Sequence, residues 1–401
     1  MKDVVYWVWL LMVMGAHNVK SVQLYHKYEN IKKVYEILNS DKGKILSEAQ
    51  IKRCKNITLE KAKQTVDYCN KSDITIITLD DERYPARLAS IYNSPILLFC
   101  IGDLSFVDNE VTIAVVGTRK PSKYSIDVAS SICENLAKLG VVIVSGFALG
   151  IDSVAHGCAL CENSKTIAVL GSGIDYKYPS KNYKLKSVIA KNGAVISEHL
   201  PGTRPDKTNF PERNRIISGL SLGTLVIEAS VISGALITAE HALTQGRDVF
   251  CVPPANLFDK RYSGVIKYIR EGATPVFSHL DIVYEYYEDL AQKINPENPY
   301  GDYALEPTNK FAINTLDESK QEKKNKQDIE NKKEQPQIEI PVDELDELQK
   351  KIVDILREDS YIADDIAKLA KEEISSVLSA LTELEIFGYV TVTSGQRYKI
   401  S

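Results

Sequence analysis

The segment Val115-Val-Gly-Thr-Arg-Lys-Pro-Ser122 decides the fold class of this 401-residue chain. It starts within an apolar run, Thr112–Val116, turns at a glycine and leads into a helix-length stretch, Tyr124–Leu139. An apolar strand that ends at a glycine and precedes a helix is the repeating unit of a parallel α/β sheet. Ligands of such sheets bind at the carboxyl ends of the strands. The loop Gly117–Arg119 is therefore expected at a binding edge.

The alternation of strand and helix continues on both sides of this segment. Nine short runs, several of them apolar at every position, are expected to be strands, and helix-length segments separate the later ones. Continuous apolar strands are typical of a sheet that is covered on both faces, so the pattern predicts a parallel α/β sheet. The expected strands are Ile74–Thr78, Ile96–Cys100, Thr112–Val116, Val141–Ser145, Thr166–Leu170, Ala194–Ser197, Thr224–Ile227, Val249–Val252 and Thr274–Phe277.

The flanks of the sheet region differ from it in composition. Residues 1–72 have the pattern of short helices, and their apolar run Val4–Met14 is too short to span a bilayer, so we expect a buried first helix. Residues 73–290 hold the α/β domain. Residues 291–341 are polar and charged, which predicts a flexible linker. Three helical segments and a hairpin within 342–401 predict a winged helix.

Charge and cysteine content limit the function classes. The net charge of the whole chain is −5, but residues 110–279 contain 19 Lys/Arg and 14 Asp/Glu, so the positive charge lies where the motifs lie. Such a distribution suits a phosphate ligand. Seven cysteines at scattered spacings predict no disulfide framework and favour a reducing, cytoplasmic setting. The single CxxC, Cys158 to Cys161, is expected to pack in a helix, and no metal site is expected.

Two further strands are each followed by a glycine loop. The first contains Ser145 and Gly146, whose backbone could close on an oxyanion. The second, Gly171-Ser-Gly173, resembles a dinucleotide-binding loop in part, but it lacks the third glycine and Pro179 interrupts the helix that would hold a pyrophosphate. No nicotinamide, flavin or other cofactor is therefore expected.

The segment from Phe210 to Ser221, FPERNRIISGLS, carries the strongest indication of a ligand. Arg213 and Arg215 flank Asn214 near the start of a helix, where the helix dipole adds to their charge and favours phosphate. Lys207 adds a further cation, and Phe210 an aromatic ring on which a base of a single strand could stack. Solvated arginines, and a hydrophobic staple for the phenylalanine, are the structural alternatives.

A series of ordered motifs resembles the DprA/Smf family, the DNA-processing proteins of bacterial natural transformation. The motifs are VGTRKPS, VSGFALGID, TIAVLGSGID, ISEHLPGT, FPERNRIISGLS, VIEAS, SGALITAEHAL and GRDVFCVP. The resemblance implies an extended Rossmann domain between a SAM-like helical domain and a winged helix. It implies a cytoplasmic, dimeric protein without known catalysis, which binds single-stranded DNA and loads RecA during competence. By position, its DNA contacts would be Gly117, Thr118, Arg119, Ser145, Gly146, Lys207, Phe210, Arg213, Asn214 and Arg215.

The chain departs from the family pattern at several positions. Leu149 stands where the family usually has an arginine, Pro254 where it has a glycine, and Ile266 near an expected asparagine. The predicted winged helix, 342–401, has a net charge of −6. Because a recognition helix in a major groove needs positive charge, we expect this domain to contact protein and not DNA.

An enzyme is the alternative. No nucleophile or metal-ligand cluster is evident, and His199 and His241 are isolated in the sequence. Glu228, which follows Gly223-Thr224, is the best candidate for a catalytic carboxylate and resembles in part the site of phosphoribohydrolases that act on nucleoside monophosphates. A helix cap or a structural acceptor is the commoner role for such a residue.

Overall fold

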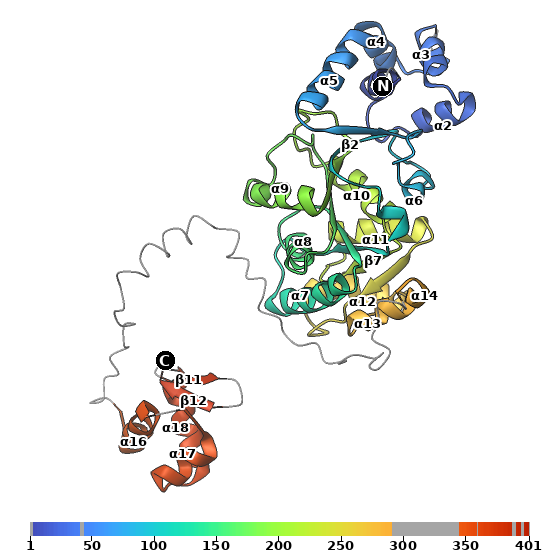
Figure 1. Ribbon diagram of the computed structural model, residues 1–401. Helices are drawn as coiled ribbons and strands as arrows, with labels where there is room; N and C mark the ends of the chain where they lie inside the picture. Colours follow the sequence, from blue (N-terminus) through green and yellow to red (C-terminus); the bar gives the residue numbers. More distant parts are fainter. Residues whose placement is uncertain are drawn as a thin grey trace, which may run out of the picture. The chain divides into compact units, whose positions relative to one another are not determined.

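The computed structural model describes residues 3–40, 44–290, 345–358, 360–386, 390–393 and 397–400. These residues form two compact units, the first made of the described residues up to 290 and the second of those from 345 onward (Figure 1). The predicted linker, 291–341, and the predicted turn of the hairpin, Ser394-Gly395, lie outside the described residues. Each unit is described by itself.

A nine-stranded sheet in the order β1-β2-β6-β5-β4-β3-β7-β8-β9 is the centre of the first unit. The seven strands from β6 to β9 are parallel, whereas β2 pairs antiparallel with β6 and β1 pairs antiparallel with β2. The mostly parallel sheet confirms the predicted fold class. The strands are β1 Thr75–Thr78, β2 Leu97–Gly102, β3 Thr112–Val116, β4 Val142–Ser145, β5 Thr166–Leu170, β6 Gly193–Ser197, β7 Gly223–Val226, β8 Asp248–Cys251 and β9 Thr274–Pro275.

Strand β3 is the point at which the chain reverses its direction of travel across the sheet. On one side it pairs with β4 (Ala114 opposite Val144), and on the other with β7 (Val116 opposite Val226). The loops that leave β3 and β7 therefore diverge to opposite faces, which opens a crevice at their carboxyl ends. This crevice is the place where doubly wound sheets bind their ligands.

Helices cover both faces of the parallel strands. Apolar residues of α7, α8 and α13 form the core on one face, with β3, β4 and β7, and those of α10, α11 and α12 form the core on the other face. The helices and the short 3-10 turns of this region are α6 Ala86–Ala89, η1 Val107–Asn109, α7 Lys123–Lys138, α8 Ile151–Cys161, η2 Ser180–Asn182, α9 Tyr183–Asn192, α10 Asn209–Gly219, α11 Gly234–Thr244, η3 Lys260–Tyr262, α12 Ser263–Arg270, α13 His279–Glu285 and α14 Tyr287–Leu290.

Five helices precede the sheet and gather around the edge that β1 and β2 form (Figure 1). The first is buried, as predicted: Trp7 and Trp9 are each 1% exposed, and the Trp9 indole donates to the carbonyl of Ile57 at 2.9 Å. No helix among the described residues is long and apolar enough to cross a membrane. The five helices are α1 Val4–Met14, α2 Val19–Tyr28, α3 Ile31–Asn39, α4 Glu48–Asn56 and α5 Leu59–Lys71.

The second unit packs three helices against a three-stranded sheet in the order β10-β12-β11. Its core includes Ile352, Ile366 and Leu381. This arrangement agrees with the predicted winged helix, and the short strand β10 adds to the predicted hairpin. The elements are α16 Glu347–Glu358, β10 Tyr361–Ile362, α17 Ala363–Ala370, α18 Ile374–Ile386, β11 Val390–Thr393 and β12 Arg397–Ile400.

Candidate nucleic-acid interface

A groove of about 540 Å³ opens at the carboxyl ends of the central strands. It is bounded by the loop after β3, the first turn of α10 and the first turn of α11, so it lies at the crevice that the sheet topology creates. A smaller pocket beside it is lined by the loops after β4 and β5. The groove is lined by Val116, Gly117, Thr118, Arg119, Ala148, Asp152, Tyr178, Lys207, Phe210, Pro211, Arg213, Asn214, Ile217, Ser233, Gly234, Ala235 and Thr238.

Arg213 forms the inner wall of the groove. It is 4% exposed, and its Nη1 donates to the carbonyls of Gly146, at 2.7 Å, and Val169. Burial lowers the pKa of Arg213 to about 10, although Asp152 acts in the opposite direction. Burial also raises the pKa of Asp152, against the effect of Arg213. A cation held by neutral carbonyls and one partly compensating acid keeps an attraction for anions.

Phe210 lies between two guanidinium groups and a second aromatic ring. The guanidinium carbons of Arg119 and Arg213 are 5.5 and 6.0 Å from its ring centroid. The ring of Tyr178 lies 5.8 Å away at an interplanar angle of 36°. A Cβ on Gly171 would come within 2.7 Å of Cδ1 of Phe210, so this position must be glycine for the ring to lie there. The half-buried ring is thus fixed in place and still borders the groove.

The rim of the groove carries exposed cations and polar backbone. Arg119 and Lys207 are both exposed, and Thr118 precedes the arginine in the loop after β3. Asn214 donates to the carbonyl of Gly234 at 3.1 Å, which ties the start of α10 to the start of α11. The structure therefore brings together seven predicted lining residues (Gly117, Thr118, Arg119, Lys207, Phe210, Arg213 and Asn214), with Gly146 on the adjoining pocket.

Two predicted residues do not line the groove. Arg215, on α10, is directed at Glu198 instead: its Nη1 and Nη2 each donate to an oxygen of that carboxylate at 2.7 Å. Ser145 is fully buried, and its hydroxyl donates to the carbonyl of Val115 at 2.6 Å. Arg213 and Arg215 therefore do not face the groove together, because side chains two residues apart on a helix point in different directions.

Sequence reasoning missed several lining residues. Gly171 belongs to the loop that resembled a dinucleotide site in part, and Tyr178 lies further along the same connection after β5. Ser233 and Gly234 begin α11, with the serine side chain capping the helix. Each follows the carboxyl end of a strand, so the topology could have indicated them. Tyr178 carried no signal of its own, because its place depends on how the loop folds back on Phe210.

Glu228 serves as a structural acceptor. It is 1% exposed, and its Oε2 accepts the backbone N–H and hydroxyl of Ser122 at 3.0 and 2.7 Å and the hydroxyl of Ser125 at 2.6 Å. The hydroxyl of Tyr262 lies 2.9 Å from that of Ser122. A carboxylate near the N-terminus of α7 satisfies donors that the helix leaves free. Glu228 therefore takes the commoner of its two expected roles.

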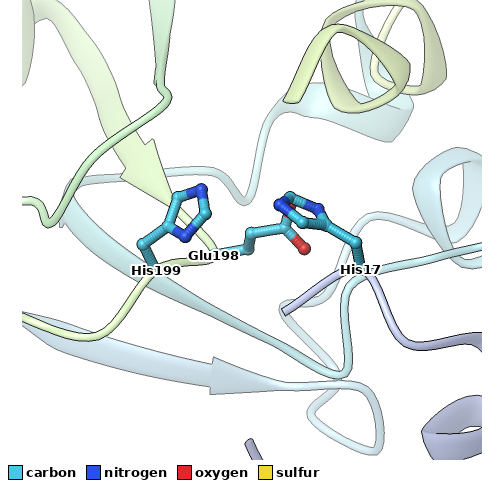
Figure 2. A group of neighbouring side chains, drawn as sticks. All are labelled: His17, Glu198 and His199. Carbon is cyan, nitrogen blue, oxygen red and sulfur yellow. The ribbon is translucent and has the colours of Figure 1, made fainter. Parts of the chain in front are cut away.

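One cluster in the described part of the chain has the composition of a metal site: His17, Glu198 and His199 (Figure 2). Candidate ligand atoms from the three residues lie within 4.8 Å of one another. However, both carboxylate oxygens of Glu198 already accept from Arg215. A divalent cation here would place further positive charge beside a buried guanidinium with one carboxylate to compensate, so the cluster does not fit a metal.

The fold and the groove define a class of protein: a doubly wound α/β protein with a cationic groove, bordered by an aromatic ring, at its switch point. Comparison with known families shows which family of this class the chain belongs to. Residues 75–287 match the family of the DNA recombination-mediator protein A, and residues 338–396 match the DprA winged helix domain. The chain belongs to this family of DNA recombination mediators.

Individual relatives agree with this assignment. The chain is 42% identical over 223 residues to the DNA processing protein DprA of Bacillus subtilis, covering 56% of this chain and 75% of that protein. It is 36% identical over 332 residues to the protein Smf of Synechocystis, covering 80% and 79%. The solved structure of DprA from Streptococcus pneumoniae has a TM-score of 0.62 and 34% identity, over 70% of this chain and 97% of that one.

Proposed function

We propose that the groove binds single-stranded DNA independently of sequence, and that this binding underlies recombination mediation. The observation that carries the proposal is Phe210, which is fixed by two guanidinium groups and by Tyr178 at the border of the groove. Unpaired bases can stack on such a ring, whereas the bases of a duplex stack on each other. Stacking contributes about 1–3 kcal/mol for each base and tolerates any sequence.

The charges around the ring suit the backbone of the strand. Arg119 and Lys207 are exposed cations at the rim, and Arg213 adds an inner cation at the start of α10. The N-terminal end of α10 carries partial positive charge from its free N–H groups. A strand in the groove would then place phosphates near the rim and a base against Phe210.

The partners of this activity are proposed from the family resemblance. We infer a homodimer that hands single-stranded DNA to the RecA recombinase in the cytoplasm, as family membership favours. The acidic winged helix would contact protein rather than DNA, because its net charge repels phosphate. We also propose that the protein catalyses no reaction on DNA or nucleotides, a proposal that the structural role of Glu228 supports.

The direct test is fluorescence anisotropy with labelled oligo-dT, single-stranded and duplex, across a salt series. Wild type is compared with Arg119→Ala, and Lys120→Ala is the matched control, because Lys120 is the exposed neighbour that does not line the groove. We expect preference for the single strand and a shallower salt dependence in Arg119→Ala, by about 0.7 in log–log slope for each phosphate that the variant no longer binds. Lys120→Ala should behave as wild type.

Absence of single-strand binding by wild type would refute the proposal. In that case the enzyme alternative is tested by incubating the protein with nucleoside monophosphates and following release of the free base. Release that disappears in Glu228→Gln would establish the alternative, and no release is the result we expect.

A further inference from the structure

The helical N-terminal region, residues 3–72, reaches the groove indirectly at two places. The first is His17, in the loop between α1 and α2. Its backbone has φ 61°, a left-handed conformation that is uncommon outside glycine. This turn places Nδ1 of His17 2.7 Å from Oε1 of Glu198, and Figure 2 shows the carboxylate directed at the imidazole. The amide of Asn93 also donates to the backbone carbonyl of His17, at 3.3 Å.

Glu198 connects His17 to helix α10. The same carboxylate holds Arg215 through two hydrogen bonds of 2.7 Å, and Arg215 lies two residues after Arg213 of the groove. Burial by itself would raise the pKa of Glu198, but Arg215 and His17 outweigh it and hold that pKa well below its usual range. The carboxylate is therefore ionised, and a buried ion pair with this geometry fixes the position of α10.

His199 completes the cluster without adding charge. Burial lowers its pKa to about 4, so its imidazole is neutral near pH 7, and its ring lies 5.1 Å from that of His17 at 73°. Its Nε2 has no hydrogen-bond partner in the described part of the chain. A neutral ring beside His17 adds no charge that would compete with Arg215 for Glu198.

The second place is Tyr68, on α5. Its hydroxyl donates to Oδ2 of Asp175 at 3.0 Å, and Oδ1 of Asp175 accepts from the backbone of Gly202 at 2.7 Å. Asp175 belongs to the loop after β5, which begins at Gly171 and carries Tyr178 to the ring of Phe210. The N-terminal region thus also contacts the 171–178 loop, which lines the groove through Tyr178.

We propose that His17 and Tyr68 are positioning residues for single-stranded DNA binding, through which the N-terminal helical region holds α10 and the 171–178 loop in their binding geometry. The proposal rests on the proposed function of the groove. Neither residue lines the groove, so their effect passes through Glu198–Arg215 and Asp175. The two contacts act on different elements, α10 and the 171–178 loop, and their effects should therefore add.

The test compares His17→Asn, Tyr68→Phe and the double variant with wild type. Asparagine tolerates the left-handed backbone at position 17, and phenylalanine removes only the hydroxyl at position 68. The matched controls are His26→Ala and Tyr92→Phe, which change exposed side chains outside both contacts. The measurements are oligo-dT affinity across a salt series and hydrogen exchange of α10 and of the 171–178 loop without DNA.

We expect the double variant to bind oligo-dT about tenfold more weakly, within the range of coupling between distinct sites, with an unchanged salt slope. Exchange should become faster in α10 for His17→Asn and in the 171–178 loop for Tyr68→Phe. Wild-type affinity together with wild-type exchange would overturn the proposal. If wild type itself fails to bind DNA, the proposed function fails, whereas the exchange data still decide whether the contacts hold the groove.

A metal-ion control separates the ion-pair account from a metal account. Zn²⁺ or Ni²⁺ added to wild type should leave the melting temperature unchanged. A metal-dependent rise in melting temperature that His17→Asn abolishes would overturn the ion-pair account of the cluster.

Discussion

At the scale of single residues, glycines decide which side chains can occupy the groove. A Cβ on Gly146 would lie 2.7 Å from Nη2 of Arg213, and a Cβ on Gly171 would lie 2.7 Å from the ring of Phe210. The guanidinium and the ring fill the space that these two missing side chains leave. The shape of the groove therefore depends on the absence of a side chain at Gly146, after β4, and at Gly171, after β5.

Gly171→Ala tests this account. The added methyl group must displace Phe210, so we expect single-strand binding to weaken by about 1–3 kcal/mol, the contribution of one stacked base. Gly234→Ala is the control, because a Cβ there meets nothing within 4 Å although the residue also lines the groove. Anisotropy measures both variants. Equal loss in the two would show that stacking on Phe210 is not the cause.

Leu149→Arg is a gain-of-affinity prediction. Leu149 is 38% exposed and lines the pocket beside the groove, next to Arg119 and Tyr178. A cation there would reach a further phosphate, so we expect tighter oligo-dT binding and a log–log salt slope steeper by about 0.7. Leu149→Gln controls for polarity without charge. An unchanged slope would place the bound strand away from this pocket.

His156 makes stability depend on pH. Its Nδ1 lies 2.8 Å from Oγ1 of Thr166, whose own proton is donated to the carbonyl of Ile143 at 2.7 Å, so Nδ1 carries the hydrogen. Burial lowers the pKa of His156 from 6.5 to about 3. The unfolded chain binds this proton first as pH falls below 6.5, so stability decreases by up to about 1.4 kcal/mol per pH unit. Urea unfolding of His156→Gln between pH 6.5 and 4 should show a smaller decrease, and an equal decrease would contradict the assignment.

The arginine pair shows what sequence can predict at this scale. Residue types and their place after strands indicated the groove, and Arg119, Lys207, Phe210 and Arg213 line it. Helical geometry could also have separated Arg213 from Arg215, because it directs side chains two residues apart to different sides, but the sequence analysis placed both at the DNA. The partner of Arg215, however, depended on Glu198, which is distant in sequence and gave no signal.

At the scale of elements, the N-cap residue of α7, Ser122, is held by a carboxylate from another part of the chain. Glu228, after β7, accepts from Ser122 and Ser125 in the first turn of this helix. This contact joins the two strand-to-helix connections that diverge at the switch point. The contact therefore fixes the start of α7 relative to the loop after β7.

Glu228→Ala should lower the free energy of unfolding by about 1–3 kcal/mol for each buried donor left unsatisfied. Urea unfolding measures it, with Glu240→Ala, an exposed acid on α11, as control. A variant as stable as wild type would show that water or Tyr262 replaces the carboxylate.

Strand positions were predictable, and strand directions only in part. All nine expected strands lie within two residues of observed ones at their first residue. Most of these strands are buried, and buried strands need uninterrupted apolar runs. The antiparallel pairing of β1 and β2 was not foreseen. An apolar run indicates that a strand is buried, but it does not indicate whether the neighbouring strand is parallel or antiparallel to it.

At the scale of the whole molecule, the helical N-terminal region shares one core with the sheet. Trp7 and Trp9 pack in the same apolar cluster as Phe99 of β2 and Val195 of β6. The composition of the chain changes near residue 72, where a domain boundary was expected, but one apolar core contains residues from both sides of this position. The winged helix forms a separate compact unit with its own core.

Deletion of residues 1–72 and deletion of residues 318–401 should therefore have opposite outcomes. The first exposes Phe99 and Val195 and should yield insoluble protein, whereas the second leaves a compact unit and should retain its melting temperature and oligo-dT affinity. Solubility, calorimetry and anisotropy check both. A soluble, DNA-binding protein without residues 1–72 would also contradict the positioning role of His17 and Tyr68.

The antiparallel edge of the sheet has a consequence for biosynthesis. Strand β2 completes its pairing only with β6, as Phe99 opposite Ser197 illustrates, about a hundred residues later in the chain. Helices α1 to α5 leave the ribosome before the sheet does, yet β2 stays unpaired on one side until β6 has emerged. During that interval the nascent chain exposes an apolar surface and an unpaired strand edge, which make it prone to aggregate.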